Sequence, residues 1–423
     1  MSAPNFGDVV LATAADHNLV VQPRMGMSRP DVMRRGLLAT RTARAHTVGT
    51  ITLDSYTRVG DHESARAALF GGVDLNGYPI VDHTVAVTRK VLDGVCTPDF
   101  PVQVRHGSAA PQHIMNALVR VGLHATEGGP LSYCLPYSRL SIAESVRAWA
   151  ESCLVLSDLG ERGPRAHLET FGGCMMGQLC PPSLLVAISI LEACFFRQHG
   201  ITSVSLSYAQ QTDPDQDVEA VAAVRALAEQ FIPDLSWHVV IYAYMGVFPR
   251  SPGGATQLLR DAAALGLRGG AHRLIVKTVA EAQRIPTMAE NVQALEAAGD
   301  AAASTRQAEL ANASPPALDS GILAAARAIV EAVLNIDANI GRALVGALKR
   351  GLIDVPYCLH PDNPGRTRAT VGKDGRLYWT RTGALPGDAA KVDVTRAEDA
   401  TSRELLRSLT HVQRRFDHAA ASG

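Results

Sequence analysis

Short runs of apolar and β-branched residues alternate, from residue 18 to about residue 278, with longer segments whose apolar positions recur at helical spacing. This alternation is typical of consecutive strand–helix units around a parallel sheet. The candidate strands lie at residues 19–22, 49–54, 78–81, 101–105, 124–127, 167–170, 202–207, 238–243 and 273–277. Amphipathic helices are predicted over residues 111–123, 140–156, 182–198, 216–231 and 255–265.

The number and length of these units favour a TIM-like (β/α)8 barrel over an open, doubly wound sheet, which would show the same alternation. Because such a barrel takes eight strands, at least one of the candidate strands is expected to be something else. We therefore assign a catalytic barrel domain to residues 1–298.

A smaller C-terminal region is predicted to follow the barrel. Composition changes after about residue 298, and a weakly structured connection is expected over 299–319, including Asn312-Ala-Ser-Pro-Pro316. Residues 320–423 then indicate one helix at 320–350, a hairpin at 369–379 turning at Asp374-Gly375, and a charged helix from residue 395.

Composition and charge argue against several classes of function for this protein. The 423 residues are 47% hydrophobic and 19% charged, with a formal net charge of -1, so bulk electrostatics indicate neither nucleic acid nor an anionic membrane as a partner. The seven cysteines form no C-x-x-C pair, and neither a disulfide framework nor a metal site is expected. The sequence shows no secretory signal and no apolar stretch long enough to span a membrane, which predicts a cytoplasmic protein.

Three arginines stand at or just beyond the ends of predicted strands: Arg24, Arg58 and Arg105. The carboxyl ends of parallel barrel strands form the active-site mouth, and guanidinium groups match carboxylates with two parallel hydrogen bonds. Each arginine taken singly also fits an ordinary surface loop. Together they predict a carboxylate-binding site.

The segment from Glu127 to Arg139 combines a carboxylate, two tyrosines (Tyr133 and Tyr137) and two glycines. The glycines would let a ligand approach the backbone, and the carboxylate would need a cation or a ligand amine as its partner. The alternative is an ordinary loop in which the glycines and the proline form turns and the two tyrosines cover the core.

Lys277 is predicted to end the last barrel strand, with Glu281 four residues later. A lysine in a barrel mouth could form a Schiff base, could donate hydrogen bonds to a cofactor, or could simply pair with Glu281. Phe171 and the segment 244–249 would supply aromatic and apolar walls. Phosphate-loop, H-E-x-x-H, G-x-S-x-G and G-x-G-x-x-G motifs are absent from the sequence.

A set of motifs in one order resembles the large (epsilon) subunit of glutamate mutase, also called methylaspartate mutase. The motifs are Gln22-Pro-Arg24-x-Gly26, Asp54-Ser-Tyr-Thr-Arg58, Asn76-Gly-Tyr-Pro79, Arg105-His-Gly107, Glu127-Gly-Gly-x-x-x-Tyr133-x-x-Pro136-Tyr137, Met245-Gly-x-Phe248-Pro249 and Lys277-Thr-x-x-Glu281-Ala-x-x-Ile285. The resemblance extends from about residue 18 to residue 380.

The resemblance implies an enzyme that uses adenosylcobalamin to interconvert L-glutamate and L-threo-3-methylaspartate through radicals, with Glu127 and Arg105 as its catalytic residues. Substrate binding would fall to Arg24, Arg58, Arg105, His106, Glu127, Tyr133 and Tyr137. The cofactor side would be lined by Gly26, Asn76, Pro136, Phe248, Lys277, Glu281 and Ile285.

The resemblance also implies a partner. The sequence lacks D-x-H-x-x-G, the motif through which a small cobalamin-binding subunit ligates the cofactor, so a separate small subunit is expected, in a heterotetramer of two large and two small subunits. Two alternatives remain: a cofactor-independent barrel lyase or aldolase using Lys277, and a non-catalytic assembly subunit.

Overall fold

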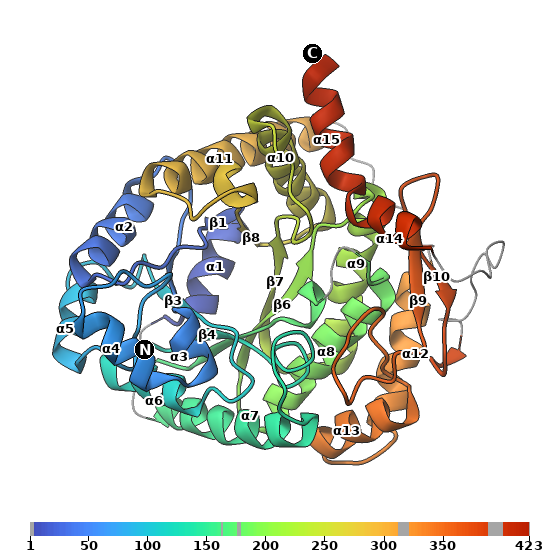
Figure 1. Ribbon diagram of the computed structural model, residues 1–423, viewed down its shortest axis with the longest axis horizontal. Coiled ribbons are helices and arrows are strands. Elements are labelled where there is room, and N and C mark those ends of the chain that lie inside the picture. The colour runs from blue at the N-terminus through green and yellow to red at the C-terminus, as the bar shows by residue number, and fades with distance from the viewer. Residues whose placement is uncertain (1–3, 162–163, 176–178, 312–320, 388–400, 423) are drawn as a thin grey trace.

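A computed structural model describes residues 4–161, 164–175, 179–311, 321–387 and 401–422 (Figure 1). Its centre is an eight-stranded, all-parallel sheet in the order β1-β8-β7-β6-β5-β4-β3-β2. A parallel bridge between Val21 and Thr47 brings the first strand to the segment that leads into β2, which nearly closes the sheet. The fold is therefore the predicted TIM-like (β/α)8 barrel.

The barrel strands are short and almost entirely buried. They are β1 (Val20–Gln22), β2 (Gly49–Thr52), β3 (Val102–Arg105), β4 (Ala125–Gly128), β5 (His167–Thr170), β6 (Ser203–Ala209), β7 (Ser236–Tyr242) and β8 (Arg273–Ile275). Both faces are covered because the strands point one face into the barrel and the other against the outer helices. Eight of the nine candidate strands are thus confirmed.

The candidate strand at residues 78–81 is wrong. Here the chain crosses the end of β2, where the Tyr78 amide donates to the Thr52 carbonyl at 2.9 Å. A Cβ atom on Gly77 would lie 2.4 Å from the backbone of Leu53, so only glycine allows this crossing. Pro79 has no amide hydrogen for a strand ladder. The segment resembles a strand in sequence because Tyr78 is a buried aromatic residue in an apolar run.

The outer helices follow the predicted pattern (Figure 1). They include α2 (Pro30–Thr42), α3 (Ser55–Val59), α4 (His62–Phe70), α5 (Val85–Leu92), α6 (Gln112–Val121), α7 (Ile142–Ser157), α8 (Pro182–Gln198), α9 (Pro214–Phe231), α10 (Pro252–Gly269) and α11 (Met288–Ala311). Local signals fix their ends: Ser141 and Glu144 form a capping box at the start of α7, and Gly122, with φ of 88°, ends α6. An additional helix, α1 (Phe6–Ala15), contacts β1, β6 and β7 and places Phe6 against the barrel.

The C-terminal region packs on one side of the barrel. Its elements are α12 (Ile322–Leu334), α13 (Ile340–Arg350), the antiparallel hairpin β9 (Arg368–Val371) and β10 (Leu377–Arg381), α14 (Ser402–Leu409) and α15 (His411–Ser422). Helix α12 packs on α8 and α9, and α15 packs on α10. The Gln216 side chain both accepts from and donates to the backbone of Leu377, at 2.8 and 3.0 Å, which ties the hairpin to α9.

Three details of this region differ from the prediction. The single helix predicted at 320–350 is two helices, α12 and α13, and the Asp337 and Asn339 side chains accept hydrogen bonds from the backbone where α13 begins. Helix α11 continues to Ala311 through the start of the expected connection, since its alanine-rich sequence favours helix, and the rest of that connection, 312–319, lies outside the described residues. The terminal helix is divided into α14 and α15, with residues 395–400 outside the described part. None of the helices among the described residues is long and apolar enough to cross a membrane.

Candidate active site

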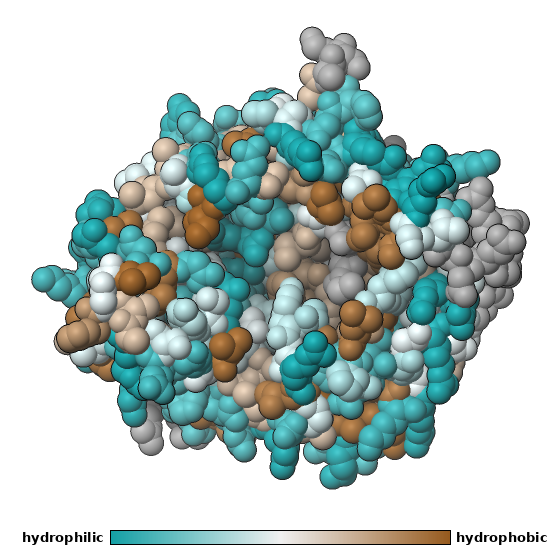
Figure 2. All heavy atoms as spheres, viewed as in Figure 1, coloured by the Kyte–Doolittle hydropathy of each residue, from teal (hydrophilic) through white to brown (hydrophobic). Residues whose placement is uncertain are grey.

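Polar side chains gather at the carboxyl ends of the barrel strands. Arg105 ends β3, Glu127 lies in β4, and Tyr242 ends β7. The face of the molecule in Figure 2 is hollowed at its centre, inside the ring of helices seen in Figure 1, and hydrophilic residues line one side of that hollow. The fold therefore brings together residues that are more than a hundred positions apart in the sequence.

The strongest contact in this group is the ion pair between Arg105 and Glu127. Arg105 Nη2 lies 2.6 Å from Glu127 Oε2, and both side chains are buried. Arg105 uses its other terminal nitrogen for different partners, since Nη1 donates to the Tyr242 hydroxyl at 2.9 Å and lies 3.5 Å from Glu169 Oε1. The fork of the guanidinium thus joins two carboxylates and one hydroxyl.

Two tyrosines complete the surroundings of Glu127. The Tyr133 hydroxyl donates to Glu127 Oε1 in a short contact, and the Tyr242 hydroxyl lies 2.8 Å from Glu127 Oε2. Burial raises the pKa of Glu127, whereas the charge of Arg105 lowers it. The predicted carboxylate and Tyr133 are therefore in one hydrogen-bonded cluster with Arg105.

Beneath this cluster lies a second, fully buried ion pair that the sequence did not reveal. Glu169, in β5, pairs with Arg273, in β8, in a short contact, and both side chains are fully buried. Arg273 and Arg105 hold the pKa of Glu169 down, to about 2, against the effect of burial. Glu169 is ionised at neutral pH and connects the barrel interior to Arg105.

His106 follows Arg105 and presents one unused nitrogen. Its Nδ1 accepts a hydrogen bond from the Ser108 amide at 3.0 Å, and its Nε2 is buried without a hydrogen-bond partner among the described residues. Burial, with the charges of Arg58 and Arg105, lowers the pKa of His106 to about 3, so the ring is neutral. A neutral ring that accepts at Nδ1 carries its hydrogen on Nε2, which makes Nε2 a donor beside the Glu127 backbone.

Arg58 and Arg24 extend the positive charge from Arg105 towards Lys277. Arg58, in α3, donates from Nε to the Leu53 carbonyl at 3.0 Å, and burial, together with the charge of Arg24, lowers its pKa. Arg24 is one-third exposed, at 34% of its side-chain surface, and its Nη1 lies 3.8 Å from Glu281 Oε2. The three arginines therefore have different immediate partners, and Arg24 shares Glu281 with Lys277.

Lys277 is buried after β8. Its ammonium lies 3.8 Å from Glu281 Oε2 and 5.0 Å from the centre of the Phe248 ring. Burial, followed by the charge of Arg24, lowers the pKa of Lys277 to about 8. At 3.8 Å the lysine and Glu281 are too far apart for a hydrogen bond, so both retain hydrogen-bonding capacity.

The remaining predicted residues are more peripheral. Gly26 packs so closely that a Cβ atom would lie 2.0 Å from the Thr52 carbonyl, and Asn76 accepts from the Ser55 amide at 2.9 Å. Pro136 is half-buried, whereas Tyr137 and Ile285 are exposed, at 56% and 65%. The Tyr137 ring is 6.2 Å from that of Tyr133.

The glycines after Glu127 pack against two side chains of the barrel. A Cβ atom on Gly128 would lie 2.5 Å from the Trp149 ring, and one on Gly129 would lie 2.0 Å from Glu192 Oε1. These glycines therefore allow the backbone to approach the side chains of Trp149 and Glu192 closely.

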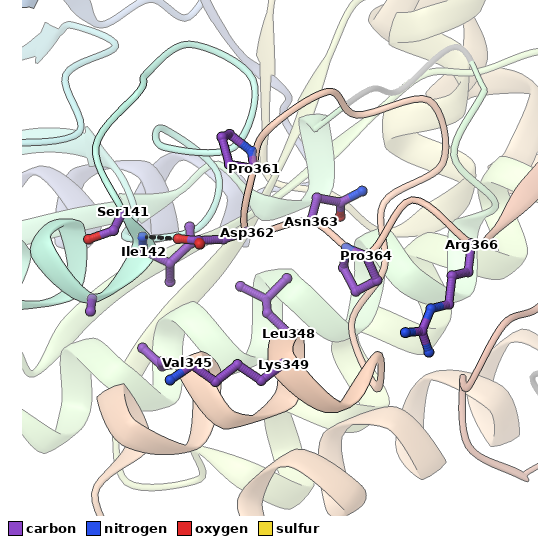
Figure 3. Close-up of a pocket in the computed structure, with 11 residues that line it drawn as sticks. Ser141, Ile142, Val345, Leu348, Lys349, Pro361, Asp362, Asn363, Pro364 and Arg366 are labelled. Carbon is purple, nitrogen blue, oxygen red and sulfur yellow. Dashed lines mark hydrogen bonds between the residues drawn. The ribbon is translucent and has the colours of Figure 1, made fainter.

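A separate cavity of about 440 Å³ lies between α7, α13 and the segment around residues 361–366 (Figure 3). At its wall the Ile142 amide donates to Asp362 Oδ2 at 2.7 Å, so the start of α7 is already paired with a carboxylate. None of the predicted site residues lines this cavity.

The barrel and its charged mouth define an enzyme of the (β/α)8 class, in which catalytic groups come from the carboxyl ends of several strands. The family model of the methylaspartate mutase E chain matches residues 2–406, and the chain belongs to this family.

Curated relatives agree with this assignment. The chain is 28% identical over 394 residues to the glutamate mutase epsilon subunit of Escherichia coli O157:H7, covering 90% of this chain and 81% of that subunit. It is 29% identical over 400 residues to the glutamate mutase epsilon subunit of Halobacterium salinarum, covering 92% of this chain and 83% of that subunit. The family and these relatives indicate a subunit of a mutase, and the name epsilon subunit implies a separate partner subunit.

Proposed function

We propose that this chain is the substrate-binding subunit of an adenosylcobalamin-dependent mutase that interconverts L-glutamate and L-threo-3-methylaspartate. The observation that carries the proposal is the buried pair of Arg105 and Glu127, with His106 beside it. An amino dicarboxylic acid needs cations for its carboxylates and an anion for its ammonium group, and this cluster offers both. Arg58 and Arg24 supply further positive charge for the second carboxylate.

In the proposed site, Arg24, Arg58, Arg105 and His106 hold the substrate carboxylates. Glu127, held by Tyr133, accepts a hydrogen bond or a proton from the substrate amino group, and Tyr137 covers the site. Bidentate contacts restrain the fragments of a rearranging substrate, because two parallel hydrogen bonds fix orientation as well as position.

The residues near Lys277 fit a nucleoside cofactor. Lys277 and Glu281 have unused hydrogen-bonding capacity, which suits the hydroxyl groups of a ribose, and Phe248 provides an apolar wall. When bound, adenosylcobalamin supplies a carbon-centred radical by homolysis of its cobalt–carbon bond. The chain positions the reactants and excludes water, with Gly26, Asn76, Pro136 and Ile285 on the cofactor side.

The proposal includes a small cobalamin-binding subunit of the D-x-H-x-x-G type, in an assembly of two large and two small subunits. This chain contains no such motif. We expect the isolated chain to be inactive with adenosylcobalamin alone.

The test combines this chain, a small subunit with the D-x-H-x-x-G motif, adenosylcobalamin and L-glutamate, and follows 3-methylaspartate by chromatography. Product is expected only when all components are present. Turnover without the small subunit would contradict the partner requirement, and absence of product in the complete mixture, with both subunits folded, would contradict the reaction.

A further inference from the structure

Helix α8 carries a buried carboxylate with no role in the proposed chemistry. From Pro182 to Phe196 every residue of the helix is buried, and Glu192 is the only Asp, Glu, Lys or Arg in that stretch. Its side chain is fully buried, and no cation among the described residues compensates its charge. An uncompensated buried carboxylate is costly, so its hydrogen bonds must account for its presence.

Within the described part of the chain, the Glu192 carboxylate accepts five hydrogen bonds. Oε1 accepts from the amides of Leu131 and Ser132 at 3.3 and 2.9 Å. Oε2 accepts from the Ser132 hydroxyl at 3.0 Å and from the amides of Phe171 and Gly172 at 3.3 and 2.9 Å. Burial raises the pKa of Glu192 to about 7, and these donors oppose that rise by favouring the charged form.

The donors belong to two different loops, one after β4 and one after β5. Glycines let both loops approach the helix: a Cβ atom on Gly129 would lie 2.0 Å from Glu192 Oε1, and one on Gly172 would lie 2.7 Å from the side chain of Ile188. The carboxylate therefore fastens two loops to a single helix, and the glycines are required for that attachment.

The first loop carries a side chain of the proposed active site, and the second carries the ring that packs against it. Tyr133 follows Ser132 and donates to Glu127 Oε1. The Phe171 ring lies 4.9 Å from the Tyr133 ring and 5.4 Å from the Tyr242 ring. A displacement of either loop would move the tyrosine that orients Glu127 or the ring that supports it.

We infer that Glu192 is a positioning residue, which fixes Tyr133 and Phe171 around Glu127 by clamping the backbone of both loops. It does not touch the substrate. Its effect on the reaction rests on the proposed function, whereas its effect on the loops does not.

The first experiment therefore measures the loops directly, in the full chain without cofactor. Glu192→Gln replaces one acceptor oxygen by an NH2 group that faces amide donors. Hydrogen exchange followed by mass spectrometry is expected to show faster exchange at amides 131–132 and 171–172, by about tenfold at the loop that faces the new NH2 group. That loop loses its acceptor, whereas the other loop keeps an acceptor that is no longer charged. Glu229→Gln, at an exposed position of α9, is the matched control and should leave both loops unchanged. Unchanged protection in Glu192→Gln would overturn the inference whether or not the chain is a mutase.

The second experiment uses the complete enzyme, once the wild type shows turnover. Glu192→Gln is expected to lower kcat about tenfold while KM for glutamate changes less than about threefold, because the arginines that hold the carboxylates do not depend on this clamp. Ser132→Ala removes one of the donors, keeps the carboxylate, and should give a smaller decrease in kcat. If the Gln variant does not fold, Ser132→Ala alone must show faster loop exchange and a lower kcat. An unchanged kcat in a folded variant with loosened loops would refute the positioning role.

Discussion

The arginine fork at the centre of the site provides the sharpest prediction, through the substitution Arg105→Lys. Arg105 contacts Glu127 through Nη2, at 2.6 Å, and Tyr242 through Nη1, at 2.9 Å. A lysine has one ammonium on a flexible stem and cannot span both partners while also meeting a substrate carboxylate. The variant should therefore lose at least one charge-assisted hydrogen bond.

The size of the effect follows from that loss. A hydrogen bond to a charged group contributes about 1.5–3 kcal/mol. If it is made in the transition state, kcat/KM should fall roughly 10- to 100-fold, since about 1.4 kcal/mol corresponds to a factor of ten. Folding should be largely preserved, because lysine keeps a positive charge beside the buried Glu127. A substitution that left this carboxylate without any cation would strongly destabilise the fold.

The assay compares kcat/KM for glutamate in the reconstituted enzyme, with circular dichroism as the check on folding. Arg44→Lys is the control, because the Arg44 side chain is 83% exposed and pairs with Glu296 on the outside of the barrel. A folded Arg105→Lys variant with near-normal kcat/KM would remove Arg105 from the carboxylate site.

Three further predictions concern Tyr242 and Lys277. Tyr242→Phe removes the hydroxyl that joins Arg105 to Glu127, and we expect kcat/KM to fall about tenfold with an unchanged circular dichroism spectrum; wild-type kinetics would argue against a role for this hydroxyl. Because the pKa of Lys277 is lowered to about 8, the lysine loses its charge as pH rises through 8, so cofactor affinity in the assembled complex should decrease between about pH 7 and pH 9. Spectroscopic titration of Lys277→Met should show weaker binding without that pH dependence, and an identical pH profile in the variant would refute the assignment. Borohydride with carbonyl compounds should leave no adduct on Lys277 by mass spectrometry, and a trapped adduct would support an aldolase instead.

Local patterns predicted most of the fold because strands and helices are encoded in neighbouring positions. The errors arose where a local signal was overridden. Tyr78 is buried like a strand residue, yet the glycine before it and the proline after it place the chain across the end of β2. Between α12 and α13 the apolar spacing continues, but α12 ends at Leu334 and the Asn339 side chain caps the start of a new helix, while Asp337 accepts from the Asn339 amide.

The site was predicted less completely because its partners are distant in the sequence. Arg105 and Glu127 each follow an apolar run and could be placed at strand ends. Glu169 and Arg273 lie 104 positions apart, within runs that read as ordinary strands, so nothing local paired them. The available signal was a charged residue within an otherwise apolar run, because a buried charge needs polar partners. The same signal marks Glu192 in the apolar helix α8.

The two ion pairs explain how Arg105 could keep its position during binding. Under the proposed function, the substrate ammonium competes with Arg105 for Glu127, and the substrate carboxylate competes with Glu127 for Arg105. Binding then breaks the contact through Nη2, but Nη1 keeps Glu169 and the Tyr242 hydroxyl as partners. Glu169 is itself fixed by Arg273, so the guanidinium remains anchored at one nitrogen while the other changes partner. A group with several donors at fixed angles can do both at once, which is why we expect the reaction to need arginine at this position.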